Sequence, residues 1–307
     1  MSGRLQLDDS GAETLEAREV PLGGIRGITV HRTLPHRSRP TIGAWCFADH
    51  FGPTDARMNV LPHPHTGLQT VTWPMAGRIR HRDNLGSDVM LQPGELNLMT
   101  SGDAVSHSEI SDADDPTPMS GVQLWVALPD SRRLGPADFE HVPDLPRVQG
   151  RGWDGVLVVG DFAGESSRAT VYTPLVGVQI SLHDPDVVLD LDPSFEYGVL
   201  ALDGPVEVDG TTVGHRALRY LDGGSRVHLD GPGRTVLLLG GEPFAEKLVM
   251  WWNFIARDHD EIVQARDDWM ERPVGGRFGR VEGHGEELVP APELPNVRLR
   301  PRVRLKY

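Results

Sequence analysis

The sequence contains a single cysteine, Cys46, so no disulfide can form within the chain. Cys46 stands in the apolar run Ala44-Trp45-Cys46-Phe47-Ala48, and we expect a buried thiol with a structural role. No run approaches the roughly 18 apolar residues of a membrane helix. Residues 1–10 also lack a basic stretch followed by an apolar one, the mark of a secretory signal. These absences predict a cytoplasmic protein that does not span a membrane.

Basic residues are scarce as well. The chain has 30 Lys and Arg against 44 Asp and Glu, a formal charge of −14. Such a charge argues against general affinity for nucleic acid or anionic membranes, while a protein partner with a basic patch stays open. The last residues, from Arg298 to Lys306, alternate basic with mostly apolar side chains. They fit a basic face for an acidic partner or a tail packed on the acidic body, and we expect the packed tail.

Long helical periodicity is almost absent. Short strand-like runs recur between Gly, Pro, Asp and Asn residues, and the chain has 35 Gly and 25 Pro to supply such turns. These runs are 69–73, 77–81, 122–128, 156–159, 197–202, 206–208 and 234–239. Two helices are predicted, over about 242–256 and 258–270, the second with Asp258 as its N-cap. The pattern predicts an all-β protein with a few short helices.

The length and an internal echo indicate two similar domains. A chain of 307 residues fits two domains of about 150 residues each. A glycine turn enters an alternating strand at 76–81 and again at 203–208, about 127 residues later. A second match sets 93–95 (PGE) beside 222–224 (DGG). Two short matches can arise by chance, but with the length they favour duplication. We predict two tandem β-barrels, an N-terminal domain at 1–145 and a C-terminal domain at 146–307, with the end of the chain packing back on the body.

Two pairs of side chains are candidate metal ligands. His63 and His65 are separated by one residue, and His107 and Glu109 repeat that spacing. Residues i and i+2 of a strand project to the same face, so two facing strands inside a small barrel would bring three imidazoles and one carboxylate together. This ligand set suits Fe, Ni, Cu or Zn and leaves positions open for water, substrate or dioxygen. The open positions favour redox or hydrolytic chemistry over a structural ion.

A simpler interpretation also exists. A lone His-x-His pattern is weak evidence, because exposed strand histidines produce it and the chain has 13 histidines. The second pair, placed after the Pro93-Gly94 turn, is harder to ascribe to chance. The triplet His81-Arg82-Asp83 resembles part of a kinase catalytic loop, but no glycine-rich loop or Lys-bearing strand accompanies it. We therefore interpret that triplet as a strand end and a turn.

The residues around the two pairs resemble the pirin family of the cupin superfamily. The resemblance spans most of the chain, and its N-terminal motifs are specific. The matching segments are 47–53 (FADHFGP), 63–73 (HPHTGLQTVTW), 81–86 (HRDNLG), 93–95 (PGE), 99–102 (MTSG), 107–109 (HSE), 241–243 (GEP) and 277–279 (RFG). The sequence departs from the usual pattern at Thr66, where the family has Arg, and at Leu68-Gln69, where it has Phe-Glu. Those departures affect the expected substrate preference more than the metal site.

The resemblance implies two cupin (jelly-roll) barrels and one mononuclear metal ion, held in the N-terminal barrel by His63, His65, His107 and Glu109. Fe(II) is the expected ion, with Ni, Cu, Mn or Zn as alternatives. Some members show quercetin 2,3-dioxygenase activity, so the implied reactants are a flavonol or other small aromatic compound and dioxygen. We expect Glu109 to be the catalytic residue, which either stays a ligand or accepts a proton from a substrate hydroxyl. Other members regulate transcription factors or metabolic enzymes, which leaves a non-enzymatic regulatory protein as the alternative.

The second half lacks a matching set. The 127-residue offset places Asp190 and Asp192 opposite the first pair of histidines, and Arg234 and Val236 opposite the second pair. Two aspartates could bind a hard cation, but no partners cluster with them in the sequence. We therefore expect the C-terminal barrel to be metal-free.

Overall fold

The computed structural model describes residues 12–22, 28–271 and 276–301. Its contacts divide these residues into two units. The first consists of residues 12–18, 31–48 and 144–244, and the second of residues 19–22, 28–30, 49–143, 245–271 and 276–301. The break in the middle of the chain lies between Pro143 and Asp144. Residues 245–271 and 276–301 group with the unit that contains the histidine pairs, whereas the sequence-based division assigned them to the C-terminal domain.

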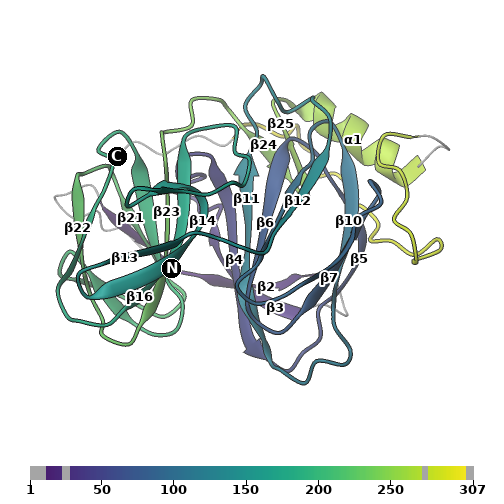
Figure 1. Cartoon of the computed structure of the whole chain (residues 1–307). Helices are drawn as coiled ribbons and strands as arrows, with labels where there is room; N and C mark the ends of the chain where they lie inside the picture. The colour runs from purple at the N-terminus through teal and green to yellow at the C-terminus, as the bar shows by residue number, and fades with distance from the viewer. Residues whose placement is uncertain (1–11, 23–27, 272–275, 302–307) are drawn as a thin grey trace. The chain divides into compact units, whose positions relative to one another are not determined.

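The unit with the histidine pairs is built around a large and a small sheet (Figure 1). The large sheet runs in the order β12 (Asp138–Val142), β9 (Leu96–Thr100), β6 (Leu68–Ala76), β11 (Met119–Ala127), β4 (Trp45–Thr54), β3 (Ile28–Leu34) and β2 (Arg18–Leu22). The small sheet runs in the order β5 (Asn59–His65), β10 (Val105–Ser111), β7 (Ile79–Asp83) and β8 (Asp88–Leu91).

The other unit repeats this plan. Its large sheet holds β1 (Glu13–Leu15), β21 (Leu218–Leu221), β18 (Glu196–Ala201), β23 (Thr235–Gly241), β16 (Leu175–Leu182), β14 (Trp153–Phe162) and β13 (Arg147–Gly150), with β15 (Glu165–Ser166) paired to β14. Its small sheet runs in the order β17 (Val187–Asp190), β22 (Arg226–Asp230), β19 (Val206–Val208) and β20 (Thr211–Val213). Two jelly rolls of matching strand order confirm the all-β, two-cupin prediction.

The 127-residue offset holds for only part of the repeat. It relates β7 to β19, as the echo at 76–81 and 203–208 predicts. The hairpin of β19 and β20 is shorter than the hairpin of β7 and β8, so Arg226–Asp230 stand at the place of β10. Arg234 and Val236, predicted there, lie just before and within β23 instead.

The predicted helix over 242–256 is wrong. That segment contains the hairpin of β24 (Val249–Trp251) and β25 (Phe254–Ala256), which turns at Trp252 with a φ of 51°. A nearly continuous apolar run has no period that separates a buried helix from buried strands. The second helix, α1 (His259–Glu271), lies beside this hairpin in Figure 1. Asp258 caps it as predicted, because its Oδ1 accepts the backbone N–H groups of residues 260 and 261.

The interiors of the two units differ in chemistry. In the C-terminal cupin the inward positions of β17 and β22 are Val187, Leu189, Val227 and Leu229, all within one buried aliphatic cluster. The corresponding strands of the N-terminal cupin carry histidines on that face, as described below. Cys46 is buried and forms no disulfide, which confirms the predicted burial of its thiol. Among the described residues no helix has both the length and the apolar character needed to cross a membrane.

Candidate metal centre

The two histidine pairs meet on the inner face of the small sheet. Strands β5 and β10 are antiparallel, with His107 opposite His63 and Val105 opposite His65. The intervening residues of β10 face the other way, where Ser106 Oγ donates to the carbonyl of Phe278. Alternation along the strands therefore turns the three imidazoles inward, as the sequence predicts. Their exposed fractions are 6% for His63 and 1% for each of the others.

An irregularity in β5 sets the direction of His63. Between Val60 and His63 the strand contains one residue more than the facing stretch of β10, so the ladder is bulged there. The bulge lets His63 Nδ1 lie 3.0 Å from the carbonyl oxygen of Leu61. β5 is also an edge strand of its sheet, which accommodates Pro62 and Pro64 despite their missing N–H groups.

The hydrogen bonds of His63 and His65 fix which nitrogen each ring presents to the cluster. The Nδ1–H of His63 donates to Leu61, and that of His65 donates to the carbonyl of Asn253 at 3.3 Å. Both rings then present Nε2 with a free electron pair. The Nε2 atoms of His65 and His107 are 3.1 Å apart, and ligand nitrogens of all three rings lie within 4.8 Å of one another.

These residues fit a transition metal. Two imidazole nitrogens about 2.1 Å from one ion and at right angles would be about 3.0 Å apart, close to the separation of His65 Nε2 and His107 Nε2. Burial lowers the pKa of His63 to about 4 and the pKa values of His65 and His107 well below the ordinary value. The rings are therefore neutral at pH 7, the form in which imidazole binds a metal.

Glu109, the fourth predicted ligand, stands next to this trio. It falls within 4.8 Å of ligand atoms of His107 and His81, which form a second, overlapping group. Burial raises the pKa of its carboxyl, partly offset by an electrostatic interaction with His81 and by a 2.8 Å hydrogen bond from Thr72 Oγ1 to Oε1. The structure thus brings His63, His65 and His107 into one group and joins Glu109 to them through His107.

His81 is a residue that the sequence interpretation missed. The triplet at 81–83 does end strand β7 and begin a turn, but His81 pairs with Glu109 across the ladder and points inward. Its ring stacks on Phe139 at 4.3 Å, and its Nε2 lies 3.1 Å from Asp83 Oδ2. Burial of Asp83 is outweighed by hydrogen bonds from His81 and Ser87, so its carboxyl pKa is lowered. The i, i+2 spacing of His81 and Asp83, shared with the other two pairs, was the available signal.

The β24–β25 hairpin completes the surroundings of His65. Thr66, the next residue, bridges to Phe254, and its carbonyl accepts the N–H of Ile255 at 3.0 Å. This approach requires glycine at position 67, where φ is 69° and a Cβ atom would lie 2.3 Å from the carbonyl oxygen of Ile255. The hairpin is therefore close enough for Asn253 to hold the His65 ring.

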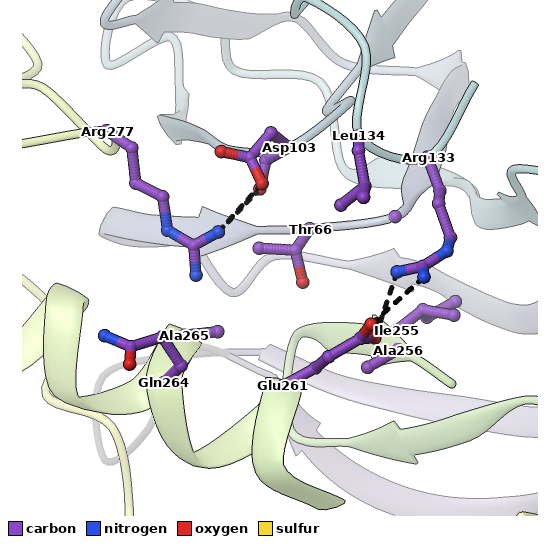
Figure 2. A pocket seen from close by; sticks show the side chains of 11 residues that line it. Thr66, Asp103, Arg133, Leu134, Ile255, Ala256, Glu261, Gln264, Ala265 and Arg277 are labelled. Atoms are coloured by element: carbon purple, nitrogen blue, oxygen red, sulfur yellow. Dashed lines mark hydrogen bonds and ion pairs between the residues drawn. The ribbon is translucent and has the colours of Figure 1, made fainter. Parts of the chain in front are cut away.

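A cavity of about 150 Å³ lies between the hairpin, α1 and the start of β6. Figure 2 shows an Arg277–Asp103 pair at one end of it and an Arg133–Glu261 pair at the other, with Thr66 between them.

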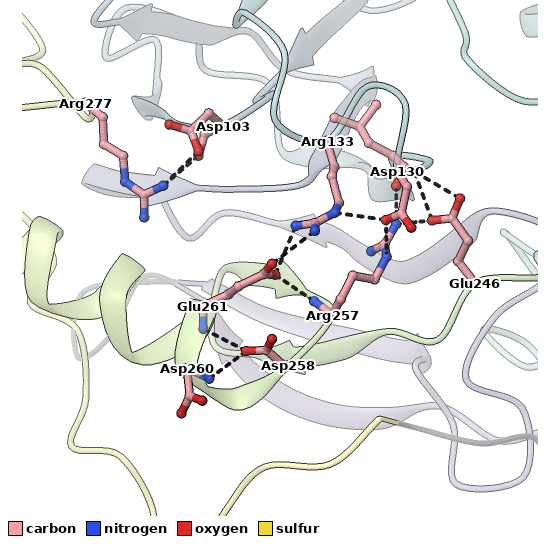
Figure 3. A network of polar contacts seen from close by, with 10 residues as sticks. Asp103, Asp130, Arg133, Glu246, Arg257, Asp258, Asp260, Glu261 and Arg277 are labelled. Carbon is pink, nitrogen blue, oxygen red and sulfur yellow. Dashed lines mark hydrogen bonds and ion pairs between the residues drawn. The ribbon is translucent and has the colours of Figure 1, made fainter.

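A network of ion pairs fastens the hairpin and α1 to the cupin (Figure 3). Arg133 reaches Glu261 with two nitrogens, both at 3.0 Å, and pairs with Asp130 at 2.9 Å. Arg257, at the end of the hairpin, pairs with Asp130 and Glu246. The carbonyl that holds His65 thus depends on side chains far from it in the sequence.

The predicted pair Asp190 and Asp192 is not brought into a ligand cluster. Both are exposed; Asp190 pairs with Arg226, and Asp192 Oδ1 accepts hydrogen bonds from Ser194. Arg298, from the basic end of the chain, pairs with Asp260, in keeping with a packed tail; residues 302–306 of that tail lie outside the described residues.

The comparisons with known proteins agree with the two-cupin fold. The Pirin family model matches residues 27–126, and the model for the Pirin C-terminal cupin domain matches residues 178–278. A Pseudomonas aeruginosa protein named "Putative quercetin 2,3-dioxygenase PA1205" is 44% identical, over 92% of this chain and 90% of its own length. A Caulobacter vibrioides "Pirin-like protein" is 34% identical, over 91% and 98%. The crystal structure of a quercetin 2,3-dioxygenase from Acinetobacter baumannii superposes with a TM-score of 0.89 at 39% identity, covering 94% of this chain and 97% of its own. The chain, a bicupin with a buried histidine cluster that can bind a metal, belongs to the pirin family.

Proposed function

We propose that the protein is a metal-dependent dioxygenase that acts on a flavonol or a related small aromatic compound. The observation that carries the proposal is the group of three buried, neutral imidazoles with a carboxylate beside it, in a chain similar to proteins named quercetin 2,3-dioxygenases. The proposed ligands are His63, His65, His107 and Glu109, in the N-terminal of two domains that divide near residue 145. With a single, buried cysteine, such a protein suits the cytoplasm.

The donor set indicates which ion would serve. Three imidazoles and one carboxylate suit Fe(II), the ion we propose, while Ni, Cu, Mn or Zn would also accept these ligands. A bound metal of this kind would supply the redox chemistry that links an aromatic substrate to dioxygen. The protein's part is to keep the three rings neutral and oriented, which burial and the hydrogen bonds to Leu61 and Asn253 do.

Glu109 is the proposed proton acceptor. Its raised pKa makes the carboxylate a stronger base toward a substrate hydroxyl than an exposed glutamate would be. The hydroxyl of Thr72 holds one of its oxygens in place. Glu109→Gln keeps the size and removes the basicity, so we expect turnover to be lost while metal retention falls less than in His63→Ala. Full activity of the Gln variant would contradict the role.

The direct test is oxygen uptake by the iron-loaded protein with a panel of flavonols and other polyphenols. We expect uptake with at least one flavonol, and loss of both uptake and metal in His63→Ala. His228→Ala is the matched control, because His228 lies on β22, the counterpart of β10, and is exposed. It should keep both. Elemental analysis should give one metal ion per chain; a value near two would contradict the proposal.

One observation favours a second candidate, a metal-dependent regulatory protein without turnover. The four proposed ligand side chains are almost completely buried, with exposed fractions between 1% and 6%. A partner would then respond to the conformation that the bound ion gives to the protein surface, without contacting the ion. The two candidates separate in the same experiment, because a regulator would retain one metal through His63 and consume no oxygen with any member of the panel.

A further inference from the structure

His81 and Asp83 lie against the proposed metal centre without belonging to its ligand set. His107 Nδ1 is 3.4 Å from His81 Nδ1, and His81 Nε2 is 3.1 Å from Asp83 Oδ2. All three side chains are buried, with exposed fractions of 1% or 2%. The strand register supports the contacts, because His107 is the ladder partner of Asp83. A continuous row of hydrogen-bonding groups therefore runs from His107 away from the cluster.

The row has one arrangement of protons that satisfies every member. If His107 offers Nε2 to the metal, its Nδ1 must carry the proton and donate to His81 Nδ1. His81 is then protonated on Nε2 and donates to Asp83 Oδ2. The other oxygen, Oδ1, accepts the backbone N–H groups of Leu85 at 2.9 Å and Ser87 at 3.0 Å. This order of donors requires an ionised aspartate at the end of the row, because both carboxylate oxygens then accept hydrogen bonds.

We propose that His81 and Asp83 are positioning residues that fix the tautomer and orientation of His107 and, through the Asp83 charge, strengthen it as a metal ligand. The proposal rests on the proposed metal site and extends it by two residues. The stacking of His81 on Phe139 supports it, since an interplanar angle of 16° holds the relaying ring in one plane. Asp83 is also among the residues that line a cavity of about 190 Å³, together with Arg82, Ser87 and Asp88.

Asp83→Asn tests the order of protons. An amide nitrogen facing His81 Nε2 would donate to it, moving the His81 proton to Nδ1, where it meets the His107 N–H. In the other orientation of the amide, its nitrogen would face the N–H groups of Leu85 and Ser87, so that donors would meet donors. Because loss of such a supporting partner typically costs 10- to 100-fold in metal affinity, we expect a loss of about that size. His81→Phe, which keeps the aromatic stack on Phe139, should show the same loss. Asp88→Asn is the matched control, since Asp88 lies on the neighbouring strand β8 and pairs with Arg80 and Arg82 of β7 instead of with His81.

The measurement uses the full chain with one equivalent of Zn²⁺, a diamagnetic probe, competed against a chelator, with the melting temperature of each metal-free variant as a check on folding. Nitrogen-15 NMR of the histidine rings in the zinc-loaded protein supplies the second readout, and it should show the His81 proton on Nε2. Equal zinc affinity in wild type, Asp83→Asn and His81→Phe would overturn the proposal, as would a His81 proton on Nδ1. Two zinc ions per chain that fall to one in His81→Phe would also overturn it, because His81 would then be a ligand. Zinc retained after His63→Ala would instead show that the proposed metal site is wrong.

Discussion

Trp269 offers a sharp test of how the C-terminal segment supports the metal centre. Its side chain is 1% exposed and lies in a cluster with Phe254 and Phe278, the latter in an edge-to-face contact at 5.7 Å. Its indole N–H donates to the carbonyl of Val289 at 3.0 Å. A tryptophan buries about 150–250 Å², worth about 4–6 kcal/mol at 25 cal/mol per Å² as an upper limit. Measured truncations of buried aromatics cost about 3–5 kcal/mol, which is our expectation for Trp269→Ala.

Trp252 provides the matched control. It contacts the same cluster from the turn of the β24–β25 hairpin, but it is only partly buried. Truncation of a fully buried ring at this place would cost about 3 kcal/mol. Because the Trp252 ring is only partly buried, we expect Trp252→Ala to cost less than half as much as Trp269→Ala. Both variants lose the same side chain, so the difference between them isolates burial.

The assay is urea unfolding of the metal-free variants followed by circular dichroism, together with zinc retention against a chelator. Trp269→Ala should also weaken zinc retention, because the cluster holds the hairpin whose Asn253 carbonyl orients His65. Equal destabilisation by the two substitutions, or a cost below about 1 kcal/mol for Trp269→Ala, would refute the packing argument. Unchanged zinc retention in a clearly destabilised variant would refute the link from the hairpin to the metal.

Three further predictions concern other parts of the chain. Glu261→Gln should lower the free energy of unfolding by about 1–2 kcal/mol, measured in urea, because it weakens the bidentate pair with Arg133 in a partly exposed site; an effect unchanged in high salt would contradict this. Burial raises the pKa of Tyr197 from 10.0 to about 12, so the hydroxyl loses its proton at a lower pH in the unfolded chain than in the folded one. The protonated hydroxyl therefore contributes fully to the free energy of unfolding below pH 10, and this contribution is lost as the pH rises to 12. It amounts to at most about 3 kcal/mol, and Tyr197→Phe should flatten the alkaline fall in melting temperature. Burial also raises the pKa of the Cys46 thiol, so a thiol reagent at pH 8 should label the protein only as it unfolds; labelling at the native rate of an exposed thiol would argue against it.

The alternation of side chains along a strand was enough to predict most of the residues of the site. The period of two placed His63 and His65 on one face, and the same period placed His107 and Glu109 on the facing strand. No knowledge of the loops was needed, because each pair lies within one strand. The same rule applies to His81 and Asp83. They were interpreted as a strand end and a turn, because they lie at the end of a strand and resemble a kinase triplet.

The sequence could not reveal what depends on distant segments. The apolar residues from Leu248 to Ile255 fit a buried helix as well as a hairpin, because a continuous apolar run has no readable period. The carbonyl that holds His65 belongs to the backbone of Asn253, and any residue type has such a carbonyl. The repeat offset failed at β22 because the preceding hairpin differs in length between the two cupins while the strand order does not.

The place of Asn253 in the chain has a consequence for how the protein is made. His65 and the residue that orients it are 188 positions apart. At about 5–20 residues per second of translation, His65 is added to the chain roughly 10–40 s before Asn253. For most of that interval the three imidazoles are present on a nascent chain that does not yet contain the hairpin. The finished ligand geometry is therefore a property of the nearly completed polypeptide, and metal loaded in that geometry enters late in synthesis or after release.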